Sequence, residues 1–266
     1  MLRDITLGQY YQTDSVIHRL DPRVKLAGTL LYIISLFFFR NYIAYIIAIA
    51  FLAMVIKLSH VPFKFMVKGM RAILFLLLIT VVFNLFLTPG ETLVSVWKLT
   101  ITKEGLQTAI TMAVRLTMLV IGSSIMTLTT TPNNLTDGME KGMRPLKIFK
   151  IPVHEVAMMM SIALRFIPIL LEETDKIMKA QIARGADFES GNIIKRAKAL
   201  VPLLVPLFIS AFRRANDLAM AMEARCYRGG EGRTKMKPLV YRKRDGLAYL
   251  CILIYLVGSI TVGRIL

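Results

Sequence analysis

The chain has 266 residues, of which 55% are hydrophobic, and its mean hydropathy is +0.58. Because the apolar residues occur in long blocks, this composition excludes an ordinary soluble domain and indicates an integral membrane protein. The net charge of +17 comes from 34 Lys and Arg against 17 Asp and Glu; without aromatic–basic motifs of nucleic-acid binding, it indicates the positive-inside bias and contact with anionic membrane lipid rather than nucleic acid.

The first half of the chain predicts four membrane-spanning helices. Its opening 23 residues are polar and lack the features of a signal peptide, so the N-terminus is expected to stay in the cytoplasm. Asp21 is a good N-cap and Pro22 suits the first helical position, which predicts that a helix begins there. Four apolar runs follow, each expected to cross the membrane: Leu26–Phe39, Tyr42–Ile56, Ile73–Thr88 and Leu106–Thr130.

Two residues in this region need an explanation of their own. Arg115 interrupts the fourth run, where an arginine that faces lipid costs about 2.5 kcal/mol or more. We therefore expect it to contact protein, and we favour a structural partner over a role in gating or transport. Trp97 lies in the loop before this run, which is expected outside the membrane, and it is a candidate interfacial anchor.

The next segment contains two apolar runs, Val156–Leu171 and Ala199–Phe212, that resemble further spans. Both are shorter than the roughly 20 residues that a crossing helix needs, and both contain proline. The segments around them are all basic, so two crossings would place the basic stretch Glu172–Lys198 outside. We therefore predict two long amphipathic helices that begin and end at the cytoplasmic face of the membrane.

A last span, Leu247–Val262, follows the basic cluster Arg242–Arg244. The sequence thus predicts an all-α integral membrane protein with about five transmembrane helices and two long cytoplasmic helices. Its C-terminus is expected outside the cell. We expect three segments: a four-span region at 1–130, the cytoplasmic helices at 131–244 and the final span at 245–266.

The sequence lacks the motifs that usually carry catalysis. Walker A, GxSxG, HExxH and zinc-spaced Cys/His motifs do not occur, and the three histidines are far apart. The acidic group Glu172–Asp175 is more typical of a solvated helix face or a contact for lysines than of a metal site. The predicted spans hold no acidic residue away from their ends, which argues against ion-coupled transport by this chain alone.

Two arginine triplets are the strongest functional signal: Ala183-Arg184-Gly185 and Ala224-Arg225-Cys226, each after a long segment that is apolar first and charged later. Complementing the helix dipole, worth roughly 0.3–1 kcal/mol, would explain one basic residue at a helix end. It does not explain two arginines between small neighbours, which leave the whole guanidinium open to a partner. Six methionines on the same helices either fill a core or form an adaptable contact platform: Met158, Met159, Met160, Met178, Met220 and Met222.

Over nearly its full length the chain resembles the transmembrane (T) components of energy-coupling factor transporters, of the EcfT/CbiQ type. These transporters are ATP-driven importers of vitamins and related micronutrients, mostly in bacteria and archaea. The resemblance rests on the opening His18–Lys25 (HRLDPRVK), on Leu164–Pro168 (LRFIP) and, most specifically, on the two arginine triplets in the matching order. Cys226 departs from the pattern, in which glycine or alanine is more usual.

The resemblance implies that Arg184 and Arg225 lie at the tips of two crossed coupling helices and insert into grooves of two ABC-type ATPase subunits. ATP and Mg²⁺ would be bound by those partners, so this chain would hold no cofactor and would not be an enzyme. A membrane-embedded S component, dedicated or exchangeable, would capture the substrate. This chain would be a multi-pass scaffold in a bacterial cell membrane that couples ATP hydrolysis to uptake.

Several alternatives remain open at this point. The methionines and the missing metal signature favour vitamin uptake through shared S components, whereas the same family includes cobalt and nickel importers. A membrane enzyme acting on a phosphorylated lipid would show clustered metal ligands or a nucleophile beside a base. A self-sufficient channel or secondary transporter would show polar or inverted-repeat spans.

Overall fold

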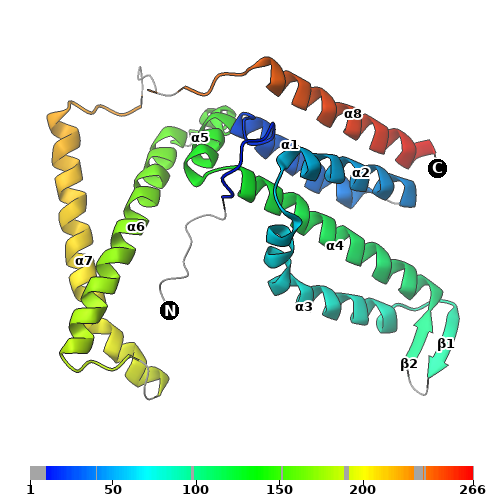
Figure 1. The fold of residues 1–266 in the computed structure, drawn as a ribbon, viewed down its shortest axis with the longest axis horizontal. Helices are drawn as coiled ribbons and strands as arrows, with labels where there is room; N and C mark the ends of the chain where they lie inside the picture. Colours follow the sequence, from blue (N-terminus) through cyan, green and yellow to red (C-terminus); the bar gives the residue numbers. More distant parts are fainter. Residues whose placement is uncertain are drawn as a thin grey trace. The chain divides into compact units, whose positions relative to one another are not determined.

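The computed structural model describes residues 10–39, 41–96, 99–150, 152–188, 192–230, 236 and 238–265. Helices account for most of them, which confirms the all-α fold class (Figure 1). The α-helices are α1 (Pro22–Phe38), α2 (Tyr42–Ser59), α3 (Phe63–Leu87), α4 (Lys103–Thr129), α5 (Pro132–Gly142), α6 (Val153–Ala183), α7 (Ile193–Ala224) and α8 (Lys243–Ile265), with a 3₁₀ helix at Arg144–Phe149.

A small β-hairpin connects α3 to α4, where the sequence predicts only a loop. Strands β1 (Thr92–Val96) and β2 (Leu99–Thr102) pair antiparallel, and they are rich in Val, Ile and Thr, the residue types that favour strands. Thr102 ends β2 and caps α4, because its hydroxyl accepts a hydrogen bond from the backbone N–H of Gly105. Trp97, the predicted interfacial anchor, lies outside the described residues.

The chain divides into two compact units, which we describe separately. Among the described residues, the bundle unit consists of 10–139 and 239–265, and the long-helix unit lies within 140–238. The first of these holds α1 to α4 and α8, and the second holds α6 and α7. The three predicted segments, 1–130, 131–244 and 245–266, stay a prediction about how the chain is organised.

The core of the bundle unit forms where α1, α2, α4 and α8 pack together. Small residues let these helices approach closely: Ala48 of α2 is fully buried, and a Cβ on Gly122 of α4 would lie 2.7 Å from the Tyr32 ring. Tyr255 of α8 shares a hydrogen bond of 2.7 Å with the hydroxyl of Ser35 on α1. The bundle therefore closes through polar as well as apolar contacts.

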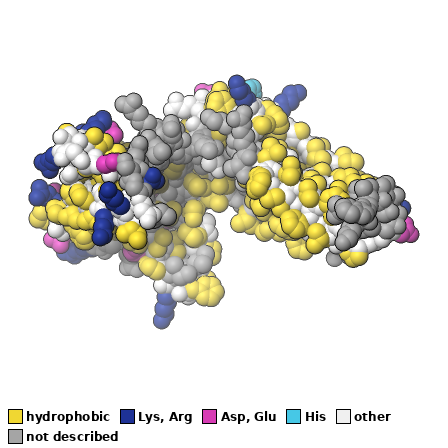
Figure 2. All heavy atoms as spheres, turned by 90° about the horizontal axis from the view of Figure 1, so that it is seen from below, with side chains coloured by type: hydrophobic (Ala, Val, Ile, Leu, Met, Phe, Trp, Pro, Cys, Tyr) yellow, Lys and Arg dark blue, Asp and Glu magenta, His cyan; other side chains and the backbone are white. Residues whose placement is uncertain are grey.

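The outside of the bundle unit is apolar. Phe37, Phe38 and Phe75 are 62%, 78% and 73% exposed, and hydrophobic side chains cover much of this unit on the face seen in Figure 2. Soluble proteins rarely expose such area, whereas lipid covers it at no cost. Helices α2, α4 and α8 are long and apolar enough to cross a membrane, and α3 contributes the shorter apolar stretch Ile73–Leu87. The protein is therefore a multi-pass membrane protein.

Helix α6 differs from the prediction that its apolar run is too short to cross a membrane. It is one continuous helix of 31 residues with Pro168 inside it, and by length and hydropathy it too could cross a membrane. The argument that its apolar run is too short is therefore wrong, because the helix extends beyond the run at both ends. The five-span count, the orientation of the termini and the cytoplasmic position of α6 now rest on the charge of the flanking segments and stay predictions.

Candidate functional site: two matching helix ends

The first arginine triplet closes α6 in a Schellman motif. The N–H of Gly185 donates to the carbonyl of Ile182 and the N–H of Ala186 donates to that of Gln181, both at 2.9 Å. Gly185 has a φ of +86°, the left-handed conformation that the residue after such a helix end requires. Arg184 is the C-cap residue, and its side chain is exposed.

The second triplet closes α7 in the same way. The N–H of Cys226 donates to the carbonyl of Glu223 at 2.8 Å, and the N–H of Tyr227 donates to that of Met222 at 3.0 Å. Cys226 takes the left-handed position with a φ of +55°, which costs a non-glycine residue roughly 1–2 kcal/mol. Arg225 thus occupies in α7 the position that Arg184 occupies in α6.

The small third residue of each triplet therefore has a second explanation. A small side chain leaves free access to the guanidinium, and the backbone also needs a positive φ at this position. A Cβ on Gly185 would meet nothing within 4 Å, so conformation rather than space favours glycine at this position. A glycine just after a predicted helix is the signal that indicates this motif from sequence.

Both arginines are open to a partner. Ala183 and Ala224 are the last helical residues, and they are exposed, as are the two arginines that follow them. Among the residues that the structure describes, neither guanidinium pairs with an acidic side chain. Each helix thus presents a free cationic fork beside a small side chain, a geometry suited to binding a carboxylate.

The two long helices cross and contact each other within their unit (Figure 1). Arg214 of α7 donates to Glu173 of α6 at 3.1 Å. Arg214 follows Glu173 by 41 residues, and Arg225 follows Arg184 by the same interval. The ion pair therefore lies equally far from both arginine tips, about 16 Å along each helix.

The acidic group on α6 serves contacts within this unit. Glu173 pairs with Arg214, and Asp175 pairs with Lys179 at 2.7 Å one turn later. These contacts agree with its interpretation as a partner for basic residues. Over the described part of the chain, no group of three or more His, Cys, Asp or Glu residues is placed to hold a metal ion.

The six methionines do not form one patch on α6. Met158, Met159 and Met160 lie near its start, whereas Met178 lies about 27 Å further along the helix. Met159, Met160 and Met220 are exposed by 57%, 37% and 60%, and the other three are half-buried. Their role as a contact platform stays a prediction, and the exposed members are the ones that a partner can reach.

Arg115 has the structural partner that the sequence favoured. Its Nε and Nη2 atoms both donate to the hydroxyl of Tyr45 on α2, at 3.0 and 2.7 Å, and its guanidinium lies 5.9 Å from the Phe37 ring centre. The arginine thereby links α4 to α2 and α1. The expectation that it contacts protein is confirmed.

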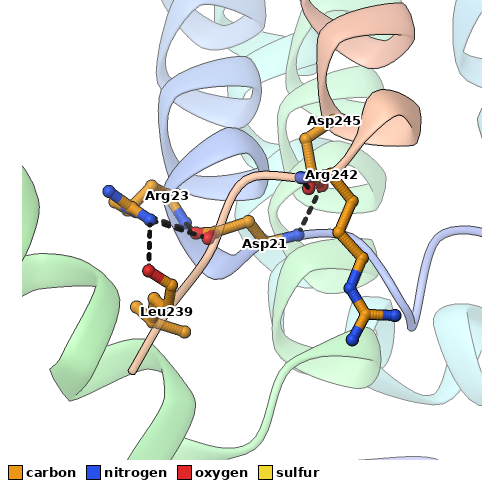
Figure 3. Close-up of polar contacts among 5 residues, drawn as sticks. All are labelled: Asp21, Arg23, Leu239, Arg242 and Asp245. Atoms are coloured by element: carbon orange, nitrogen blue, oxygen red, sulfur yellow. Dashed lines mark hydrogen bonds and ion pairs between the residues drawn. The ribbon is translucent and has the colours of Figure 1, made fainter. Parts of the chain in front are cut away.

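A polar cluster joins the beginnings of α1 and α8 (Figure 3). Asp21 caps α1, as predicted, and accepts further hydrogen bonds from the Arg23 guanidinium. The buried Asp245 accepts from the backbone N–H groups of Asp21 and Arg242, at 2.8 and 2.7 Å. The guanidinium of Arg23 also donates to the carbonyl of Leu239. Sequence reasoning missed Asp245, because its partner Asp21 is 224 positions away.

Comparison with known proteins finds similarity to one family over almost the whole chain. Residues 13–236 match the family model described as cobalt transport protein, CbiQ. Proteins named energy-coupling factor transporter transmembrane protein EcfT are similar over almost the entire length. The protein from Clostridium kluyveri is 56% identical over 98% of this chain and 97% of its own, and that from Bacillus subtilis is 47% identical over 92% and 93%.

Proposed function

This chain belongs to the EcfT/CbiQ family of energy-coupling factor transporter transmembrane proteins, and from that membership we propose that it couples two ATPase subunits to substrate uptake. In this proposal Arg184 and Arg225 each enter a groove of one ABC-type ATPase subunit and pair with a carboxylate there. The ATPases bind ATP and Mg²⁺ and perform the hydrolysis. This chain performs no reaction itself.

One observation carries the proposal: two helices end in the same hydrogen-bonded motif with an exposed arginine at the same position. A single basic helix end is common, because it complements the helix dipole. Two equivalent ends on crossed helices suit a partner that itself presents two equivalent grooves, as a pair of related ATPase subunits does. Arg225 and Arg184 would then move with the two subunits as they close.

The crossing of α6 and α7 supports transmission of that movement. Because Glu173 and Arg214 connect the helices at equal distances from both tips, displacement of either tip acts on the same crossing point. Helices are stiff over the roughly 45 Å that each of these spans. The pair can therefore turn as a lever against a membrane-embedded S component, with the exposed methionines Met159 and Met220 as contact residues.

The transported substrate belongs to the S component in this arrangement. The relatives along the full length are named for the energy-coupling factor, which favours vitamin uptake through one or several exchangeable S components. The description of the matching family model as cobalt transport protein favours the second candidate, a cobalt or nickel importer. Identifying the small membrane protein that copurifies with the complex separates the two candidates.

Replacing both arginines by glutamate tests the proposal. We expect the double variant Arg184→Glu with Arg225→Glu to insert in the membrane normally and to lose copurification of the ATPases. Lys195→Glu with Lys198→Glu is the matched control. Both lysines are exposed on α7 far from its C-terminal end, and the two substitutions reverse the same amount of charge. Full recovery of the ATPases with the double variant would contradict docking at these residues.

A further inference from the structure

The bundle unit contains a cavity that the proposed coupling function does not use. Its volume is about 260 Å³, larger than the engineered apolar cavity of about 150 Å³ that admits benzene. Residues of α1, α2, α4 and α8 and of the segment before α1 line it. Val16, Met54 and Leu247 line the cavity and are also exposed, so it opens to the outside of the bundle.

The two cationic groups of this cavity lie at one of its ends. Lys25 stands near the start of α1, Thr129 ends α4 and Arg244 stands near the start of α8. The other end lies toward the middle of the bundle and is formed by Tyr32, Phe51 and other mainly apolar residues. The cavity is thus a slot with a cationic end and an apolar interior.

Small side chains keep the slot open. Gly28 and Gly122 line it, and a Cβ on Gly28 would lie 2.8 Å from the Cδ1 atom of Ile252 on the facing helix. Ala248 of α8 also lines it. Larger residues at these positions would fill the slot, so its volume depends on them.

Arg244 supplies the second, independent observation. Its Nε–H group is buried and has no hydrogen-bond partner among the described residues, although it lies beside the cavity. A buried donor without an acceptor is unfavourable, which indicates that an acceptor occupies this position in the membrane. Lys25 lies at the same end, where its ammonium group donates to the carbonyls of His18 and Thr129, and burial there lowers its pKa to about 8.

The nearby carboxylates do not provide that acceptor. Asp21 is engaged by Arg23, and Asp245 accepts from two backbone N–H groups (Figure 3). Among the residues that the structure describes, none therefore provides the acceptor for the Nε–H group of Arg244, and the two cations favour a negatively charged acceptor from outside the chain. Lipid acyl chains are what surround an apolar opening in a membrane, and the phosphate of an anionic lipid provides both charge and acceptors.

We propose that this cavity binds one anionic phospholipid, with its phosphate against Arg244 and Lys25 and one acyl chain in the slot. The site fits a lipid of the cytoplasmic leaflet, because the start of α8 lies in the basic cluster Arg242–Arg244 that is expected on that side. The bound lipid completes the packing of α1, α2, α4 and α8. It would thereby stabilise the bundle in membranes that contain acidic lipid.

The test measures lipid retained by the full chain after purification in mild detergent with equal amounts of phosphatidylglycerol and phosphatidylcholine. Native mass spectrometry should show one retained phosphatidylglycerol per chain in preference to phosphatidylcholine. Arg244→Gln should lower that retention about tenfold, because it removes the charged donors. Arg242→Gln is the matched control: its guanidinium points away from Asp21 and Asp245, it does not line the cavity, and it should retain the lipid (Figure 3).

A second pair of variants tests the acyl-chain slot. Ala248→Leu fills the cavity and should lower retention of both lipids, whereas Val257→Leu on the same helix lies outside the cavity and should not. If Arg244→Gln fails to fold, the comparison of the two lipids in the unchanged chain and the Ala248→Leu pair still decide the matter. Equal retention of phosphatidylglycerol and phosphatidylcholine, or unchanged retention in Ala248→Leu, overturns the proposal.

Discussion

Glu173 of α6 and Arg214 of α7 form an ion pair of 3.1 Å at the crossing of the two long helices, equally distant in sequence from the two exposed arginines. Their side chains are 23% and 41% exposed, so solvent screens the pair and its contribution to folding stays below about 1 kcal/mol. We therefore expect its main role to be fixing where the helices cross. If the pair only stabilised the fold, any other contact between the two helices could replace it.

Breaking the ion pair at the crossing should uncouple ATP hydrolysis from substrate uptake while the complex stays assembled. We expect Glu173→Gln to leave ATPase copurification intact and to lower substrate uptake per ATP hydrolysed, measured in proteoliposomes with the full complex. Exchanging the charges, Glu173→Arg with Arg214→Glu, should restore uptake in part. Asp175→Asn removes the pair with Lys179 one turn further along α6 and serves as the control. Unchanged coupling in Glu173→Gln would show that the crossing does not depend on this contact.

The residue after each helix end should respond to substitution according to its φ. Cys226→Gly is expected to raise the free energy of unfolding by roughly 0.5–1 kcal/mol, because glycine adopts the left-handed conformation without steric cost. Gly185→Ala should lower it by roughly 1 kcal/mol for the same reason. Thermal unfolding of the purified chain measures both changes. Gly142→Ala is a control with open space around it and no positive φ; a loss there equal to that of Gly185→Ala contradicts the explanation.

Removal of the Tyr45 hydroxyl should lower the stability of the chain, because it leaves the Arg115 guanidinium without its acceptor. Tyr45→Phe leaves two guanidinium donors without their acceptor, so we expect a loss of about 1–3 kcal/mol in stability. The double variant Tyr45→Phe with Arg115→Met removes the unpaired donors and should recover part of that loss. Thermal unfolding in one detergent compares the three proteins. A double variant less stable than Tyr45→Phe alone would contradict this account of the pair.

Acidification should loosen the segment before α1. Burial lowers the pKa of His18, whose Nε2 donates to the carbonyl of Tyr11 and whose Nδ1 accepts from the Ser15 hydroxyl. Folding thus favours the neutral ring, so the contribution of His18 is complete above its unfolded pKa of about 6.5 and is lost as the pH falls through the lower folded value.

A nitroxide label on the exposed position Gln12 can report this change. Spectra recorded from pH 8 to pH 5 should show rising mobility of the label in the parent chain. His18→Gln, which cannot be protonated, should show mobility that is independent of pH. An identical pH response in the two proteins would assign the change to another group.

Local signals in the sequence predicted local features correctly. Asp21 and Pro22 predicted the start of α1, and Ala183 and Ala224 mark the last residues of two long helices, as the triplets suggested. The polar cluster could not be predicted from the sequence, because Asp245 contacts Asp21 only after the chain has folded. Pro168 counted as a separate sign against a crossing, yet α6 continues through it, since a helix can continue through a proline when the surroundings satisfy the freed carbonyl.

The central claim is that the two matching helix ends each contact an ATPase subunit, and site-specific photocrosslinking tests it most directly. A benzoylphenylalanine at Ala183 or at Ala224 stands next to the arginine without replacing it, and both positions are exposed. With the complex assembled, we predict that each position crosslinks to an ATPase subunit, while the same probe at exposed Lys195 does not. Crosslinks from both helix ends to lipid or to the S component alone, with none to an ATPase, would contradict the account.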